Sequence, residues 1–189
     1  MTPLQEAAKE ICDFLTRQGW RFCVVVGIAA TRWGEPRTTE DVDLCLLTGL
    51  AEERRFINTL LTTFAVRRPD AADFAESARV LLISASNGVG IDIALGWTPF
   101  EEQMVARASN FQLGPNLTLP IASPEDVVVT KALAGRPLDW IDVQRLLARQ
   151  RGKLDWEYIR RELGQLCELT EVSGPVDKLE HLKAQIDAE

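Results

Sequence analysis

The chain has 189 residues, 46% of them hydrophobic, and a formal net charge of −7. This length fits one domain or a domain with a small appendage, and the composition is sufficient for a sizeable core. The negative charge argues against a nucleic-acid interface over the whole chain, because neutralising phosphates requires clustered lysines and arginines. A local basic cleft is compatible with it.

The residue types also exclude several kinds of protein. The single histidine, His181, lies in a segment rich in Lys and Glu, so neither a Ser-His-Asp triad nor a histidine metal cluster is expected. There is no P-loop and no G-x-G-x-x-G pattern. The four cysteines lack C-x-x-C spacing and are expected as reduced thiols. With no signal-peptide pattern and no apolar run of ~20 residues, we expect a cytoplasmic protein that does not enter a membrane.

The first predicted elements are a helix, a strand and a glycine turn. Apolar residues at helical spacing predict a helix from Thr2 to about Gly19. The run Phe22–Val26 predicts a strand, and 28–33 can form a short helix after Gly27. A glycine between a strand and a helix lets backbone amides approach a phosphate, and the helix N-terminus adds partial positive charge. Gly27 is therefore a candidate phosphate-binding residue.

The next predicted strand, ending near Leu47, opens with Asp41 and Asp43. Alternation along a strand puts both carboxylates on one face, about 6.6 Å apart at roughly 3.3 Å of rise per residue. Hard divalent cations such as Mg²⁺ bind carboxylate oxygens and substrate phosphates, so the pair is a candidate metal site. Arg37, just ahead of it, suits phosphate oxygens. The simpler alternative is the solvent-facing side of an amphipathic strand.

A third aspartate occurs in a predicted β-hairpin. After a helix over 51–64, the strands 79–84 and 90–95 are joined by the turn signal Asn87-Gly88. Asp92 stands between two isoleucines in the second strand, where aspartate is disfavoured. We interpret Asp92 as a third metal ligand, with the polar member of an edge strand as the alternative.

The second half of the chain is predicted to be mainly helical. After a helix from Thr98 to about Ala108, Ser123-Pro124 starts a helix that carries Lys131 and stops near Gly135. Further helices are expected over 137–150, 155–169 and 175–186. We therefore predict a core over 1–122 and a C-terminal helical part over 123–189 that packs on it.

These motifs resemble the polymerase-beta-like nucleotidyltransferase superfamily, and more narrowly the small bacterial nucleotidyltransferases related to abortive-infection toxins. The resemblance spans 22–147. It lies first in GIAATRWGEPRTTEDVDL, where the family carries a Gly-Gly pair and then Arg-x-Thr-x-Asp-h-Asp. The segment 37–43 fits the second pattern apart from an inserted or shifted threonine, whereas Val26-Gly27 lacks one glycine of the pair. A later lysine and Arg-x-x-Asp-x-x-Asp correspond to Lys131, Arg136, Asp139 and Asp142.

The resemblance implies a mixed twisted sheet with flanking helices and a C-terminal helical layer, which is an α/β (α+β) fold. It implies transfer of a nucleoside monophosphate from an NTP to an acceptor hydroxyl, with release of pyrophosphate. Asp41, Asp43 and Asp92 would be catalytic and hold Mg²⁺, with Mn²⁺ as the alternative ion.

The resemblance also gives roles to basic residues and suggests partners. Lys131 and Arg136 join Gly27 and Arg37 as candidate nucleotide-binding residues, with Arg136 also ion-paired to Asp139 beside the cleft. A toxin–antitoxin role with an antitoxin protein is a further implication, and tRNA, protein or a small molecule are the acceptor classes. The alternative is an inactive module of the same fold that binds a nucleotide or a partner, for which Val26 is the main argument.

Overall fold

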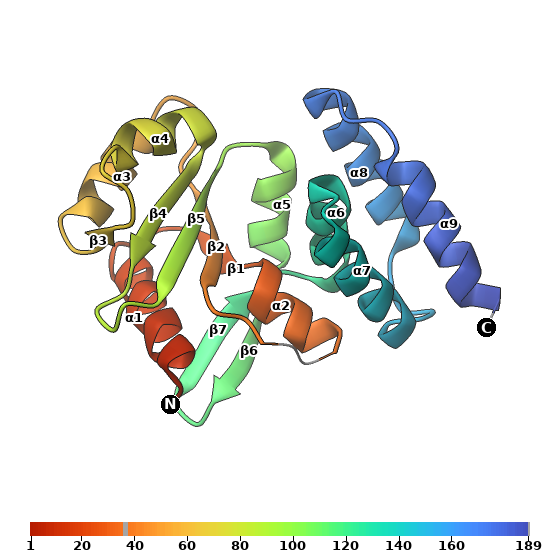
Figure 1. The fold of residues 1–189 in the computed structure, drawn as a ribbon, viewed down its shortest axis with the longest axis horizontal. Coiled ribbons are helices and arrows are strands. Elements are labelled where there is room, and N and C mark those ends of the chain that lie inside the picture. The colour runs from red at the N-terminus through yellow and green to blue at the C-terminus, as the bar shows by residue number, and fades with distance from the viewer. Residues whose placement is uncertain (36–37, 189) are drawn as a thin grey trace. The chain divides into compact units, whose positions relative to one another are not determined.

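The computed structural model describes residues 1–35 and 38–188 (Figure 1). The chain divides into two compact units. The first comprises Met1–Ile28 and Thr38–Ala122, and the second comprises Ala29–Arg37 and Ser123–Glu189. The strands are β1 (Phe22–Val24), β2 (Val42–Leu47), β3 (Ala65–Val66), β4 (Val80–Ser84), β5 (Gly90–Gly96), β6 (Ser109–Gly114) and β7 (Leu117–Ile121). The helices are α1 (Pro3–Arg17), α2 (Val26–Trp33), α3 (Glu53–Leu61), α4 (Ala71–Ala78), α5 (Pro99–Arg107), α6 (Pro124–Ala134), α7 (Pro137–Arg149), α8 (Trp156–Thr170) and α9 (Pro175–Ala188).

The first unit is built on one mixed sheet. Over the described residues, its seven strands follow the order β3-β4-β5-β2-β1-β7-β6. Strand β2 runs parallel to β5 and antiparallel to β1, while β1 runs parallel to β7. Helices α1, α3, α4 and α5 belong to the same unit. The predicted α/β fold with a mixed sheet and flanking helices is confirmed.

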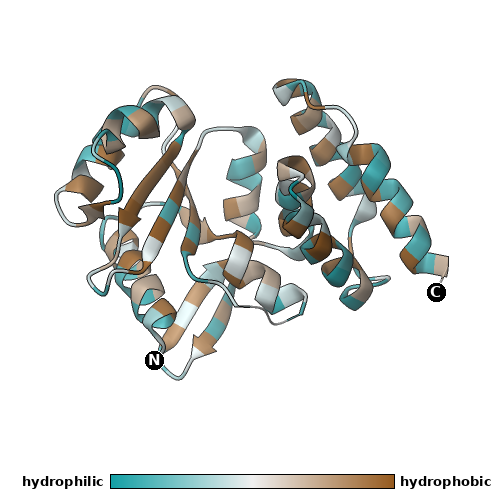
Figure 2. Ribbon diagram, viewed as in Figure 1, coloured by the Kyte–Doolittle hydropathy of each residue, from teal (hydrophilic) through white to brown (hydrophobic). Residues whose placement is uncertain are grey.

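Alternation along β2 and β5 separates the core from the face that carries the aspartates. Every second residue of the two strands is fully or almost fully buried: Val42, Leu44 and Leu46 in β2, and Ile91, Ile93 and Leu95 in β5. Figure 2 shows mostly hydrophobic colours along β4 and β5. Because side chains alternate across a strand, Asp43 and Asp92 lie on the opposite face, and both are partly exposed. Burial of the apolar face fixes the register, since a slip of one residue would bury the aspartates.

The predicted hairpin is confirmed, whereas several other elements were not predicted. Strands β4 and β5 pair antiparallel from Val80↔Ala94 to Ser84↔Gly90, and Gly88 in the turn has a φ of +84°. The sequence patterns did not indicate β3, α4 or the β6–β7 hairpin. In that hairpin β6 is partly exposed throughout and β7 contains Pro120. A proline normally argues against a strand assignment, and exposure weakens the apolar pattern.

Over its described residues, the second unit contains the helices α6, α7, α8 and α9 and the segment 29–35, which includes most of α2. Helix α6 starts at the predicted cap, where the Ser123 hydroxyl accepts a hydrogen bond from the Asp126 N–H, and ends at Gly135 with a φ of +66°. The carbonyl oxygens of Trp33 and Gly34 accept hydrogen bonds from α7 and the residue after it, at 2.8 Å from Gln150 Nε2 and 2.7 Å from Arg149 Nη1. Within the described part of the chain, no helix has the length and apolar character needed to cross a membrane.

Candidate active site

Two of the three predicted aspartates occupy neighbouring positions in the sheet. Asp43 of β2 and Asp92 of β5 are Cα partners in the parallel register. Side chains in register on adjacent strands share a face, and adjacent strands lie about 4.8 Å apart. The pairs on either side, Val42↔Ile91 and Leu44↔Ile93, are buried on the opposite face and hold this arrangement.

Asp41 lies at the edge of the same site but outside the strand. It occupies a bend, and β2 begins at Val42, one residue later than predicted. The Asp41 side chain is 47% exposed, and its Oδ1 is 3.8 Å from Nη1 of Arg67. A Cβ atom at Gly90, the first residue of β5, would overlap the Asp41 carboxylate. The missing side chain at Gly90 therefore leaves room for Asp41 above the start of β5.

Arg67 is a residue of this site that the sequence analysis missed. It directly follows β3, and its N–H donates a hydrogen bond to the Leu82 carbonyl oxygen at 3.2 Å. Its Nη2 forms a hydrogen-bonded ion pair with Asp92 Oδ1. Arg67 is 25 residues from Asp92 in sequence, and only the pairing of β3 with β4 and of β4 with β5 brings the two together.

The surroundings of Asp92 raise the pKa of its carboxyl group. Partial burial raises the pKa of Asp92, the Arg67 charge and hydrogen bond lower it, and the Asp41 charge raises it, with a raised pKa as the net result. A raised carboxyl pKa means that the folded protein holds the ionised form less favourably than the unfolded chain does. Additional positive charge at this position would therefore stabilise the ionised carboxylate.

The prediction of a strand to Val26 and a turn at Gly27 was wrong: β1 ends at Val24, and Gly27 lies in the first turn of α2, which begins at Val26. Gly27 nevertheless contacts the aspartate strand. The Gly27 N–H donates a hydrogen bond to Asp43 Oδ2 at 3.4 Å. A Cβ atom at Gly27 would collide with the Thr39 side chain and lie 3.4 Å from Asp43 Oδ2. Val26, which replaces a glycine of the family pattern, has a φ of +49°. The backbone at Val26 thus adopts the left-handed conformation that glycine favours, although a β-branched side chain opposes it.

In the second unit, Lys131 forms a buried ion-pair network with Asp139 and Asp142, and the exposed Arg136 pairs with Asp139 at its edge. The Lys131 side chain is 2% exposed, and its Nζ lies 3.1 Å from Asp139 Oδ1 and 2.7 Å from Asp142 Oδ2. Arg136 Nε is 2.7 Å from Asp139 Oδ2, which is the ion pair expected from sequence. Burial raises the pKa of Asp139, but hydrogen bonds from Arg136 and Lys131 outweigh it and leave this pKa lowered. Arg37 lies outside the described residues.

The site has suitable ligands for a hard divalent cation. Carboxylate oxygens are the preferred protein ligands of Mg²⁺, and β2 and β5 present two of them in register with a third two residues earlier. Among the described residues, however, no three acidic, histidine or cysteine side chains are gathered closely enough to hold one ion. Asp41 and Asp92 face the Arg67 guanidinium instead. Arg67 therefore faces two of the three carboxylates in this structure.

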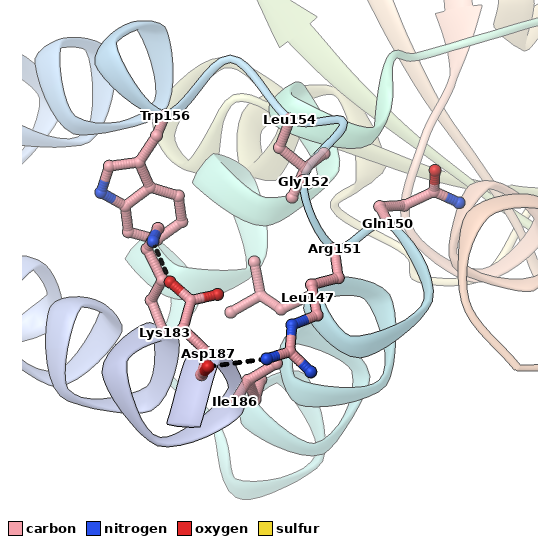
Figure 3. Close-up of a pocket in the computed structure, with 9 residues that line it drawn as sticks. All are labelled: Leu147, Gln150, Arg151, Gly152, Leu154, Trp156, Lys183, Ile186 and Asp187. Carbon is pink, nitrogen blue, oxygen red and sulfur yellow. Dashed lines mark hydrogen bonds and ion pairs between the residues drawn. The ribbon is translucent and has the colours of Figure 1, made fainter. Parts of the chain in front are cut away.

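A separate pocket of about 300 Å³ lies within the second unit (Figure 3). Trp156, Leu147 and Ile186 line its apolar part. Its charged groups bind one another, because Arg151 donates to the Asp187 carbonyl oxygen at 2.6 Å and Lys183 pairs with the Asp187 carboxylate. No residue that the sequence singled out lies in this pocket, so we assign no chemistry to it.

Comparison with known proteins identifies the fold. No family model and no curated protein matches the chain. An antigenic nucleotidyltransferase-like protein from Paracoccidioides brasiliensis aligns with a TM-score of 0.53 and 16% identity, over 92% of each chain. The lincomycin-bound lincosamide antibiotic adenylyltransferase LnuA aligns at a TM-score of 0.46 and 12% identity, over 72% of this chain and 91% of its own. The antibiotic-resistance factor ANT(2'')-Ia aligns at 0.41 and 15%, over 95% and 88%. The first similarity shows that this chain has a nucleotidyltransferase-like fold, as predicted.

Proposed function

We propose that this protein is a nucleotidyltransferase that moves a nucleoside monophosphate from an NTP to an acceptor hydroxyl. One observation carries the proposal: Asp43 and Asp92 are register partners on parallel strands, with Asp41 beside them and the Gly27 N–H on Asp43. The nucleotidyltransferase-like fold supports it. An alternating surface strand alone would explain one such aspartate, but it gives no reason for aspartates on two neighbouring strands, where like charges oppose folding.

Each residue has a defined part in the proposed reaction. Asp41, Asp43 and Asp92 would hold Mg²⁺ or Mn²⁺, and such ions stabilise charge on the attacking and leaving oxygens of an in-line displacement. Gly27 would present its backbone to the triphosphate. Asp92 would also accept the proton of the acceptor hydroxyl. The acceptor oxygen then bonds to the α-phosphorus while the bond to pyrophosphate breaks.

The basic residues of the family pattern are assigned a smaller part. Arg37 is proposed for phosphate binding on its place in the sequence alone. Lys131 and Arg136 are proposed as nucleotide-binding residues on their place in the family pattern alone, and both pair with Asp139. Lys131 is buried, so its contribution would be to fix α6 and α7 and to neutralise charge within the unit.

Asparagine at each of the three aspartates tests the proposal. Removing one negative charge relieves repulsion, so Asp41→Asn, Asp43→Asn and Asp92→Asn should melt within a few degrees of wild type in metal-free buffer. The rise in Tm caused by Mg²⁺ with NTP should be lost, and pyrophosphate release should fall at least ~100-fold. Asp70→Asn is the matched control, because Asp70 is an exposed carboxylate paired with Arg68 in the same unit. If the three variants keep the wild-type metal shift, the proposed chemistry is wrong.

The acceptor and the biological role need a different experiment. Labelled NTPs would be incubated with total RNA, cell protein and small hydroxylated compounds, and the labelled fraction would identify the acceptor class. For the proposed toxin role, expression of wild type should arrest growth while Asp43→Asn should not. Growth arrest by both proteins would contradict a toxin that acts through this chemistry.

An inactive binding module of the same fold is the alternative, and Val26 was its main support. The backbone at Val26 adopts the left-handed conformation that glycine favours. The valine therefore does not prevent this conformation, which supports the active enzyme. Metal-dependent NTP binding without turnover towards any acceptor would favour the module.

A further inference from the structure

We propose that Arg67 is an internal counter-cation of the carboxylate cluster, defined as Asp41, Asp43 and Asp92, and that it competes with the divalent cation for this cluster. The inference rests on the proposed function, because it assumes that a metal ion binds these aspartates. It adds a residue that is not part of the sequence motifs and predicts that binding requires an exchange of one cation for another.

The sheet register directs Arg67 towards the cluster. The β3–β4 pairing places Val66 opposite Ile83, and the Arg67 N–H continues it with a hydrogen bond to the Leu82 carbonyl oxygen. Leu82 is the register partner of Asp92, and Asp92 is that of Asp43. Leu82, Asp92 and Asp43 thus form one row across three strands, and Arg67, directly after β3, continues the row. Residues in one row share a face of the sheet, so Arg67 reaches over Leu82 to the aspartates.

The contacts of Arg67 are with the same carboxylates that a metal would need. Its Nη2 pairs with Asp92 Oδ1, and its Nη1 lies 3.8 Å from Asp41 Oδ1. A side chain at Gly90 would also lie against the guanidinium. A guanidinium has only donors and stays charged at any accessible pH, so it cannot become a ligand or lose its charge when the metal arrives. It must move away from Asp92.

The surroundings of Arg67 allow that movement. It follows a two-residue strand at the edge of the sheet, and its side chain is 29% exposed. The next residue, Arg68, is held separately by hydrogen bonds to Asp70 at 2.5 and 2.8 Å. Arg67 can therefore turn outwards without breaking its backbone bond to Leu82 or the neighbouring ion pair.

Arg67→Gln and Arg68→Gln form a matched pair of variants for the test. Each removes one positive charge from the same segment, but only Arg67 contacts the carboxylate cluster. Mn²⁺ affinity would be measured by calorimetry, and Tm would be measured in metal-free buffer and with Mn²⁺. We expect Arg67→Gln to bind Mn²⁺ about tenfold more tightly than wild type, because no ion pair has to be broken. Without metal it should melt about 2–4 °C lower, because Asp41 and Asp92 then lose the positive charge that they face.

The control and a milder substitution complete the test. Arg68→Gln should keep wild-type Mn²⁺ affinity. Arg67→Lys retains the charge but not the two-pronged geometry, so its affinity should lie between those of wild type and Arg67→Gln. Equal Mn²⁺ affinity in wild type, Arg67→Gln and Arg67→Lys would overturn the competition while leaving the proposed function intact. Absence of Mn²⁺ binding in every protein would overturn both.

Discussion

Replacing Val26 with glycine tests whether the left-handed backbone before Gly27 is a real constraint. A left-handed φ costs an L-residue about 1–2 kcal/mol, and glycine would recover this free energy. Glycine also lowers the free energy of unfolding by about 0.5–1 kcal/mol, because it increases the entropy of the unfolded chain. Loss of a partly buried valine side chain costs about 1 kcal/mol, or roughly half the value for full burial. These contributions nearly cancel, so Val26→Gly should leave the free energy of unfolding within about 1 kcal/mol of wild type.

Two control substitutions separate the backbone from the side chain. Val26→Ala loses a similar side chain but keeps the strain, so it should be less stable than Val26→Gly by about 0.5–1 kcal/mol. Val25 is the buried residue before Val26 and has no positive φ. Val25→Gly should therefore lower the free energy of unfolding by about 3 kcal/mol. Urea unfolding followed by the fluorescence of the five tryptophans measures all three. NTP affinity should be equal or tighter in Val26→Gly. If Val26→Ala is the more stable of the two variants at 26, the left-handed backbone is not held in solution.

Three further predictions concern the turn and the ion-pair network. Gly27→Val should lower NTP affinity at least ~10-fold and also lower Tm, because the valine side chain would collide with Thr39. If calorimetry gives the variant the NTP affinity of wild type, Gly27 is not part of the site. Lys131→Met should cost about 3–5 kcal/mol in urea unfolding, because it removes a buried ammonium that pairs with two buried carboxylates. Arg136→Gln, at a side chain 70% exposed, should cost under ~1 kcal/mol, and similar losses in the two variants would contradict the buried network. The lowered pKa of Asp139 stabilises the fold above the ordinary carboxyl pKa, and this contribution is lost as pH falls through the lowered value. Asp139→Asn should therefore weaken the acid dependence of Tm, and an unchanged profile would exclude this role.

The sequence was most informative where one pattern determined both a strand and its register. Alternating isoleucines around Asp92 and the Asn87-Gly88 turn predicted the β4–β5 hairpin, which the structure confirms. A similar alternation of Asp43 with Val42 and Leu44 predicted which face of the sheet Asp43 occupies. The pairing of Asp43 with Asp92 depends on the order of strands in the sheet, and a single sequence does not contain that order except through resemblance.

The features that were missed depend on contacts between distant residues or on backbone conformation. Arg67 lies in a polar segment with no motif, and its role follows from two strand pairings. The positive φ of Val26 could not be anticipated from a β-branched residue, which disfavours it. The β6–β7 hairpin was obscured by Pro120, whose ring removes a hydrogen-bond donor from a strand.

Residues 29–35 belong to the helical unit. The middle of the segment between Gly27 and Asp41 is therefore held by residues far along the chain. Trp33 and Gly34 are bound by Gln150 and Arg149, more than a hundred residues later. This segment acts as a tether with Gly27 at one end and Asp41 at the other. Loss of the C-terminal helices would free the tether at its midpoint while leaving every strand of the sheet in the chain. If the proposed function holds, selection on the Gly27–Asp41 segment would extend to α7, which contributes none of the three aspartates.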